Sequence, residues 1–232
     1  MDRQTLMIRL SQVKILDLAL FVEAAVANNL PNLPIHPNTV KGFLRHEEGM
    51  ALHANVLARA PFGLCIEIGS YCGKSTVYLG AACKEAGGLL VAVDHHRGSE
   101  ENQPGEEYFD PDLADPSGGV SSLAHFRDTL ARAGLEDCVV PVLSRSELAA
   151  QVVAGPVSFV FIDGGHSMAA AIADYRNWAT RIMTGGTLAI HDVFPDPADG
   201  GRPPFEIYQL AMNSGLFEEI DAVHSLRLLR RL

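Results

Sequence analysis

A glycine-rich segment, EIGSYCGKST over residues 67–76, carries the strongest chemical signal in the sequence. A short apolar run precedes it and a helical pattern follows, so it is predicted to connect a strand to a helix. Gly69 and Gly73 allow the backbone to approach a ligand closely, and the first turn of the helix offers free N–H groups. The segment therefore predicts a binding loop for polar or anionic atoms.

The sequence of this loop is similar to two known nucleotide-binding motifs, and it differs from each of them at one point. A P-loop has four residues between its first glycine and Gly-Lys-Ser, whereas three separate Gly69 from Gly73. A dinucleotide loop has a glycine where this chain has Tyr71. Because FVFID over residues 159–163 is similar to a Walker B strand, a nucleotide hydrolase or kinase remains the alternative function.

Asp94 ends the next predicted strand, about 25 residues after Gly69. From that position a carboxylate can accept hydrogen bonds from both hydroxyls of a ribose without a 2′-phosphate. The loop and Asp94 together predict an adenosine-containing cofactor. A tight turn followed by a solvated acid is the purely structural alternative.

Two further carboxylates, Asp163 and Asp192, each follow a strand that we expect to neighbour the other, about 4.8 Å away. Carboxylates that converge in this way can hold a hard cation such as Mg²⁺, although acids at strand ends are also ordinary loop caps. Two acids leave the ion incompletely coordinated. The candidates for a third ligand are water, His166, His191, Glu100 and Glu101.

Histidines beside these carboxylates are candidates for moving a proton. His166 and His191 are the best placed, although a lone histidine is more often a structural hydrogen-bonding group. The long acidic connection over residues 97–119 is predicted to be either a substrate lid, in which Tyr108 and Phe109 cover an acceptor, or a solvated loop.

The elements that position these residues alternate between short apolar runs and helical patterns, as in a parallel sheet with helices on both faces. Strands are predicted over residues 64–68, 89–93, 138–143, 157–162 and 187–190, and helices over residues 74–86, 122–133, 146–153, 167–183 and 205–213. The last two runs, 216–220 and 224–229, are joined too tightly for a parallel crossover and must pair antiparallel. Two more helices, over residues 4–29 and 46–60, precede the sheet.

Composition agrees with one globular domain plus appendages, since the chain has 232 residues of which 47% are hydrophobic. A formal net charge of -10 disfavours nucleic acid and anionic membrane surfaces as partners. The four cysteines form no C-x-x-C pair, which favours a reducing, cytoplasmic setting. The apolar run over residues 15–26 is similar to a signal peptide, but Asp17 and Glu23 interrupt it.

The order of the motifs resembles the class I S-adenosylmethionine-dependent methyltransferases over residues 64–230. The motifs are EIGSYCG over residues 67–73, VAVD over 91–94, FIDGGH over 161–166 and GGTLAIHD over 185–192. The last two look most like small O-methyltransferases, many of which hold Mg²⁺. Catechol-type relatives have an asparagine where this chain has Val193.

This resemblance implies a Rossmann-like α/β fold with a seven-stranded, mostly parallel sheet and a C-terminal antiparallel hairpin. It implies that the loop from Gly69 to Gly73 holds the methionine moiety of the cofactor, above Glu67. The other implied cofactor contacts are Ser70, Ser75, Asp94 to the ribose, His95, Ser144 beside the adenine, and Asp163.

The resemblance also implies a catalytic group of Asp163, His166 and His191, with Asp163 and Asp192 as metal ligands. Residues 1–62 are predicted to be an N-terminal helical extension that serves as a lid or a homodimer contact, and residues 63–232 the methyltransferase domain. The implied reaction is methylation of a small hydroxylated acceptor. A protein that binds the cofactor without turnover is a further alternative.

Overall fold

The computed structural model describes residues 33–165 and 167–232. The predicted helix over residues 4–29 and the apolar run over residues 15–26 lie outside the described residues, as does His166.

A seven-stranded sheet forms the centre of the fold, with the order β3-β2-β1-β4-β5-β7-β6. The strands are β1 (Leu64–Ile68), β2 (Leu90–Asp94), β3 (Val139–Leu143), β4 (Val157–Ile162), β5 (Ile182–Ile190), β6 (Phe217–Val223) and β7 (Leu226–Arg231). Strands β1 to β5 are parallel, and β7 pairs antiparallel with both β5 and β6. The predicted Rossmann-like α/β sheet with a C-terminal hairpin is confirmed.

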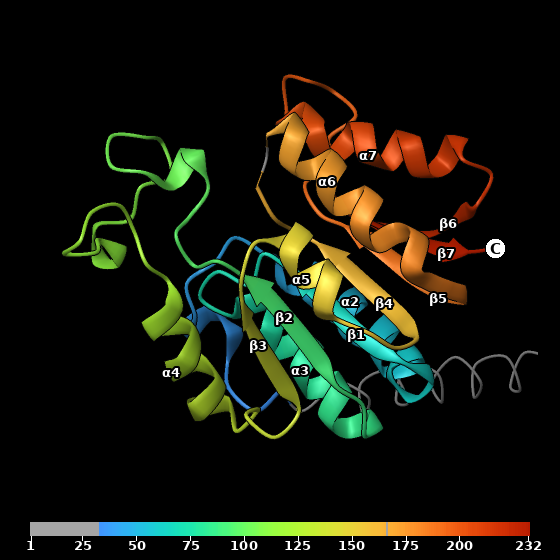
Figure 1. The fold of residues 1–232 in the computed structure, drawn as a ribbon, viewed down its shortest axis with the longest axis horizontal. Coiled ribbons are helices and arrows are strands. Elements are labelled where there is room, and N and C mark those ends of the chain that lie inside the picture. Colours follow the sequence, from blue (N-terminus) through green and yellow to red (C-terminus); the bar gives the residue numbers. More distant parts are fainter. Residues whose placement is uncertain (1–32, 166) are drawn as a thin grey trace, which may run out of the picture. The chain divides into compact units, whose positions relative to one another are not determined.

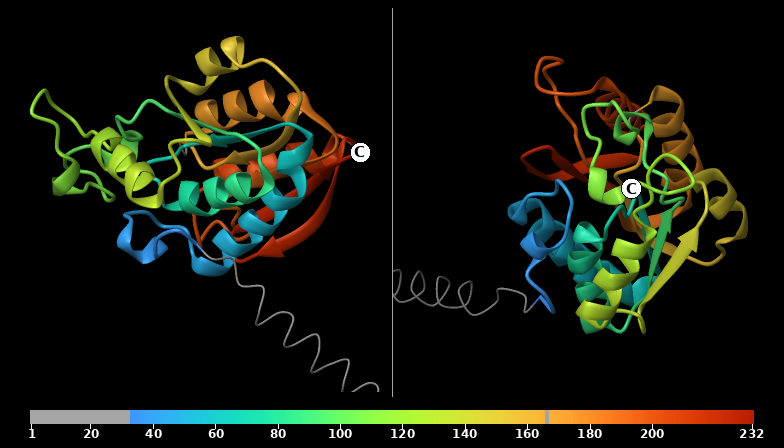
Figure 2. Two further views of the ribbon diagram at one scale, coloured as in Figure 1. Left: turned by 90° about the horizontal axis from the view of Figure 1, so that it is seen from below. Right: turned by 90° about the vertical axis from the view of Figure 1, so that its left-hand side faces the viewer.

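Helices cover both faces of the sheet (Figures 1 and 2). One face carries α2 (His46–Arg59), α3 (Lys74–Ala86) and α4 (Leu123–Ala133), and the other carries α5 (Ser146–Val152), α6 (Met168–Trp178) and α7 (Arg202–Asn213). Successive strand residues point to opposite faces, so Cys65 joins the α2–α4 core while Ile66 joins the α5–α7 core. Burial on both faces explains why the strands are almost continuously apolar.

The segment after α6 differs from the prediction. The sequence pattern predicted a helix to residue 183 and a strand from residue 187, whereas α6 ends at Trp178 and β5 begins at Ile182. Trp178 is buried and its indole N–H donates to Ser146 Oγ at 2.8 Å, which fixes the end of the helix. Ile182 is buried and pairs with Val157 of β4, so strand pairing overrides the local helical pattern here.

Helix α2 is packed into the same core as the strands. Its Leu52 and Val56 are fully buried with residues of α3, β1 and β4. Where α2 crosses α3, a Cβ on Gly49 of α2 would lie 2.5 Å from the ring of Tyr78 of α3, so glycine at this position permits the close approach. None of the described helices is long and apolar enough to cross a membrane.

Candidate active site

The glycine loop packs tightly against the carboxyl end of β4. Gly69 has φ +88, and a Cβ at this position would lie 2.0 Å from the carbonyl oxygen of Asp163. The N–H of Gly69 donates to the carbonyl of Val93 at 3.0 Å, which ties the loop to β2 as well. Gly73, at φ 93, is the N-cap residue of α3. The structure thus joins the ends of β1, β2 and β4 through this loop.

Glu67 lies beneath the loop and is fully buried. Its carboxylate accepts hydrogen bonds from Ser75 Oγ at 2.6 Å and from Thr76 Oγ1 at 2.7 Å, both in the first turn of α3. Burial raises the pKa of Glu67 to about 7, although these hydroxyls favour the ionised form. Glu67 and Ser75 therefore hold the start of α3 against β1. Ser70, also predicted as a cofactor contact, is buried in the loop.

Asp94 connects the end of β2 to the glycine loop. Its Oδ2 accepts a hydrogen bond from the Tyr71 N–H at 2.8 Å, and its Oδ1 accepts one from the His96 N–H at 2.6 Å. Ser144, at the end of β3, donates its N–H to the Asp94 carbonyl at 3.2 Å. Asp94, Ser144 and the loop, predicted separately, therefore lie together at the ends of neighbouring strands.

The two histidines after Asp94 have different surroundings. His95 is exposed, and its Nδ1 accepts a hydrogen bond from the Arg97 N–H at 3.1 Å. His96 is buried, lies 2.8 Å from Ser122 Oγ through Nδ1, and packs on the Phe126 ring. His96 is therefore a structural residue at the base of the long loop, whereas His95 stays accessible.

Lys74, the lysine of the P-loop-like sequence, is directed away from the glycine loop. Its Nζ donates to the carbonyl of Gly42 at 3.1 Å, in the segment that precedes α2. In a P-loop this lysine must reach the phosphates. Its contact with Gly42 therefore disfavours the nucleotide hydrolase alternative.

The long loop over residues 97–119 is anchored to that same segment before α2. Lys41 Nζ lies 2.5 Å from Asp110 Oδ2 and 2.8 Å from Asp112 Oδ2. The Phe43 ring contacts the Tyr108 ring at 5.7 Å in an edge-on arrangement, and it also lies 6.2 Å from Tyr71 of the glycine loop. This part of the loop thus reaches the neighbourhood of the glycine loop through Phe43.

Within the long loop, the two predicted lid aromatics differ in exposure. Tyr108 is exposed, whereas Phe109 is partly buried against a small apolar cluster that includes Val40 and Leu113. Of the two, only Tyr108 has the exposure that contact with an acceptor requires.

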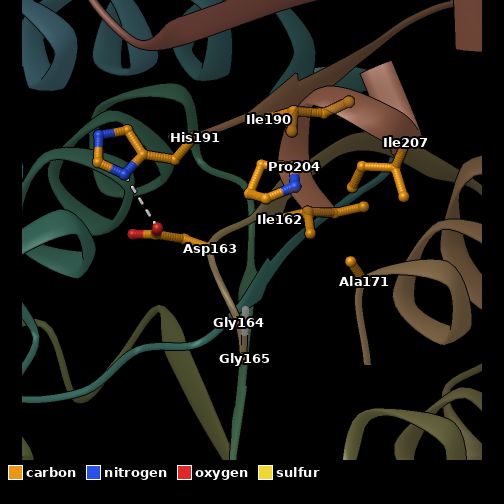
Figure 3. Close-up of a pocket in the computed structure, with 9 residues that line it drawn as sticks. All are labelled: Ile162, Asp163, Gly164, Gly165, Ala171, Ile190, His191, Pro204 and Ile207. Atoms are coloured by element: carbon orange, nitrogen blue, oxygen red, sulfur yellow. Dashed lines mark hydrogen bonds and ion pairs between the residues drawn. The ribbon is translucent and has the colours of Figure 1, made fainter. Parts of the chain in front are cut away.

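Asp163, His191 and Asp192 converge at the adjacent ends of β4 and β5. His191 Nδ1 lies 3.0 Å from Asp163 Oδ1 and 3.4 Å from Asp192 Oδ1, and one ligand atom of each residue lies within 4.8 Å of the others. Figure 3 shows the contact between His191 and Asp163. Burial lowers the pKa of His191, but the surrounding carboxylates outweigh it and raise the pKa well above its usual value.

The predicted convergence of Asp163 and Asp192 thus agrees with the geometry. Among the described residues the cluster contains His191 and neither of the two predicted glutamates, because Glu100 and Glu101 lie in η3 (Glu100–Asn102) of the long loop.

Glu48, which the sequence analysis missed, completes the surroundings of His191. It is 1% exposed, and its Oε2 lies 3.1 Å from His191 Nε2. Its Oε1 accepts hydrogen bonds from the backbone N–H of Ser225 at 3.0 Å and from Ser225 Oγ at 2.9 Å. Burial raises the pKa of Glu48, but its hydrogen bond to His191 and the other contacts outweigh this and lower the pKa to about 2. An acid one turn before Leu52, on the apolar stripe of a helix, was the available signal.

A small cavity of about 10 Å³ adjoins the cluster, on the α6–α7 side (Figure 3). It has room for about one water molecule. Its wall is mostly apolar, formed by Ile162, Ala171, Ile190, Pro204 and Ile207, with Asp163 and His191 at one side. The polar cluster is therefore backed by a packed, mostly apolar core on this side.

Known structures with the same fold include three crystal structures, all with low sequence identity. An O-methyltransferase from Bacillus cereus in complex with SAH is 16% identical, with a TM-score of 0.56, over 91% of this chain and 88% of that chain. A SAH-bound methyltransferase from Podospora anserina is 12% identical, with a TM-score of 0.61, over 93% of this chain and 96% of that chain. Cofactor-bound Rv0187 from MTB is 18% identical, with a TM-score of 0.59, over 92% of this chain and 88% of that chain.

The family assignment comes from the sequence itself. The profile of the family described as "Methyltransferase domain" matches residues 66–193, which is more than half of the chain. The match begins inside β1, and it ends just after the His191–Asp192 pair. It therefore contains the glycine loop, Asp94 and the Asp163 cluster, and the chain belongs to the methyltransferase domain family.

Proposed function

We propose that this protein transfers a methyl group from S-adenosylmethionine to a hydroxyl group of a small acceptor. One observation carries the proposal: the glycine loop and Asp94, which suit an adenosine cofactor, follow β1 and β2, and the polar cluster of Asp163 and His191 follows the next two strands of the sheet, β4 and β5. The SAH bound by the Bacillus and Podospora structures, which share the fold, supports this choice of cofactor.

The proposed cofactor contacts follow the ends of the strands. The loop from Gly69 to Gly73, with Ser70, is assigned to the methionine moiety, and Asp94 to the ribose hydroxyls. Each carboxylate oxygen of Asp94 accepts one backbone N–H and keeps a lone pair for a further donor. Ser144 and the exposed His95 are assigned to the adenosine side. Glu67 and Ser75 act from beneath, by holding the loop and α3 in place.

The reaction is an in-line displacement, in which the acceptor oxygen forms a bond to the methyl carbon as the carbon–sulfur bond breaks. The acceptor hydroxyl loses its proton to the carboxylate of Asp163, which His191 orients through the contact between its Nδ1 and Asp163 Oδ1. His166, which comes shortly after Asp163 in the sequence, is retained as an alternative proton acceptor. Asp163 and Asp192 are the residues that would hold a divalent cation, and such an ion favours the deprotonated form of a bound hydroxyl.

The division into an extension over residues 1–62 and a domain over residues 63–232 also remains a proposal. Glu48 lies within that extension and reaches His191 in the domain. The extension therefore contributes to the proposed site.

Calorimetric titration of metal-stripped protein with SAH, ATP and NAD tests the cofactor. SAH alone is expected to bind, with micromolar affinity. A Lys74→Ala variant is expected to keep that affinity, because Lys74 contacts Gly42 and not the loop. ATP or NAD binding without SAH binding would overturn the proposal. Donor binding without turnover over a broad panel of hydroxylated acceptors would leave only a cofactor-binding protein.

A further inference from the structure

We propose that Nδ1 of His191 is the third protein ligand of a divalent-cation site with Asp163 and Asp192, and that buried Glu48 fixes the tautomer this requires. A nitrogen ligand gives such a site a preference for Fe²⁺, Co²⁺ or Zn²⁺ over Mg²⁺. The inference deepens the proposed function, and it depends on that function only for the use of the ion in methyl transfer.

The spacing of the three ligand atoms fits one ion. Metal–ligand bonds of about 2.1 Å at right angles place neighbouring ligand atoms about 3.0 Å apart. His191 Nδ1 lies 3.0 Å from Asp163 Oδ1 and 3.4 Å from Asp192 Oδ1. All three atoms are within 4.8 Å of one another, a separation from which small side-chain rotations bring them onto one ion. The remaining coordination positions are left for water or an acceptor oxygen.

The position of Glu48 determines which imidazole nitrogen is available. Its Oε2 lies 3.1 Å from His191 Nε2 and holds a proton there, so an ion at the aspartates replaces the proton that Nδ1 shares with Asp163 Oδ1 in the metal-free protein. The lone pair is then on Nδ1, which faces the two aspartates. Metal-bound histidines commonly donate their other N–H to a carboxylate in this way, which orients the ring and strengthens the metal–nitrogen bond.

Glu48 is itself held firmly. The backbone N–H and the hydroxyl of Ser225 both bind its Oε1, and the N–H of Arg45 donates to Oε2 at 3.1 Å. A carboxylate with these contacts and 1% exposure cannot rotate away from the histidine without leaving buried donors unpaired. Glu48 therefore holds the imidazole of His191 in one orientation.

The charges around the imidazole also favour a cation. Glu48, Asp163 and Asp192 surround His191, which is 5% exposed. With three carboxylates and a neutral imidazole, a divalent ion offsets two of the three negative charges. Carboxylate and water oxygens alone suit Mg²⁺, whereas an imidazole nitrogen shifts affinity toward later first-row transition ions.

The first experiment uses the metal-stripped full chain with Co²⁺ alone as the probe. We expect one Co²⁺ per chain, visible absorption bands, and an affinity at least about tenfold higher than that for Mg²⁺ measured by competition. Proton NMR of the Co²⁺ form should show one strongly shifted, exchangeable imidazole resonance, from Nε2–H of His191. Equal affinities for Co²⁺ and Mg²⁺, or the absence of this resonance in a protein that binds Co²⁺, would overturn the inference.

Two variants and a matched control test the individual roles. His191→Asn should remove the shifted resonance and abolish the preference for Co²⁺ over Mg²⁺. Glu48→Gln should weaken Co²⁺ binding about 10-fold to 100-fold. Ser225→Ala is the control, since it removes one partner of the other Glu48 oxygen without touching His191. Equal Co²⁺ affinities for Glu48→Gln and Ser225→Ala would contradict the role of Glu48.

The result does not depend on variant folding, because the ion preference and the shifted resonance are measured on the unaltered protein. SAH binding is measured separately on the same metal-free protein. A chain that binds SAH but no Co²⁺ refutes the metal inference alone. A chain that binds Co²⁺ but no SAH refutes the proposed function alone.

Discussion

The carboxylate of Asp94 and the backbone N–H of Tyr71 form a 2.8 Å hydrogen bond that fastens the glycine loop to the end of β2. Tyr71 has φ 48, a left-handed conformation that a non-glycine residue adopts at some cost. The hydrogen bond helps to hold the residue there. The conformation of the cofactor loop therefore depends on a residue that is 23 positions away in sequence.

Asp94→Asn is expected to weaken SAH binding at least about tenfold and to lower the free energy of unfolding by about 1–2 kcal/mol. The amide keeps one acceptor oxygen, so the N–H of Tyr71 or of His96 loses its partner. Calorimetry and urea unfolding measure the two effects. Asp128→Asn is the control, because Asp128 is an exposed residue of α4 paired with Arg132. Unchanged SAH affinity in Asp94→Asn would contradict the assigned role.

Gly69→Ala is expected to disrupt the loop and to abolish measurable SAH binding. The added Cβ would lie 2.0 Å from the Asp163 carbonyl oxygen, and backbone at this position cannot move without shifting β4. We expect a loss of more than about 2 kcal/mol in the free energy of unfolding. Gly87→Ala is the matched control, since Gly87 also has positive φ but open space around its Cβ position. It should cost about 1 kcal/mol and leave SAH binding intact.

The stability of the protein is expected to fall between pH 4.5 and about 7 through Glu67. Its pKa is raised from 4.5 to about 7 in the folded protein, so the unfolded chain releases this proton at lower pH. The folded form is therefore favoured below pH 4.5, and that advantage disappears as pH rises through 7. The pKa difference corresponds to about 3 kcal/mol.

Urea unfolding at a series of pH values measures this contribution. Glu67→Gln should flatten the dependence of the unfolding free energy on pH in this window. Glu107→Gln, at an exposed position of the long loop, should leave that dependence unchanged. A slope in Glu67→Gln identical to that of the parent protein would show that Glu67 is not the group responsible.

Lys41→Ala is expected to release the part of the long loop that reaches toward the glycine loop. The ion pairs with Asp110 and Asp112 are partly exposed, so the melting temperature should change by at most about 3 °C. Chymotrypsin cleavage after Tyr108 should be about twofold to fivefold faster in the variant than in the parent protein. This difference should shrink at high salt, because salt screens the ion pairs of the parent protein. Lys84→Ala, which removes the exposed pair with Asp137, is the control. Equal cleavage rates in both variants would rule out the anchoring role of Lys41.

Much of the fold could be predicted from the sequence because the signals are local. The alternation of apolar runs and helical patterns placed β1 and α3 with the observed bounds, and the tight connection between residues 220 and 224 predicted the antiparallel hairpin. The prediction of a helix to residue 183 was wrong because the interaction that decides this segment is long-range. The segment from Ile182 has no local feature that distinguishes a strand from a helix, and its pairing with Val157 decides.

Within the candidate site, the sequence by itself determined which chemical groups follow which strands. Asp94, Asp163 and His191 each come directly after an apolar run, and parallel strands bring such residues to one edge. Only the tertiary structure decided their partners. Glu48 meets His191 across 143 residues, and Lys74 turns to Gly42 instead of the glycine loop. Both contacts depend on how α2 and the segment before it pack on α3, and that packing is set by long-range burial that no local pattern encodes.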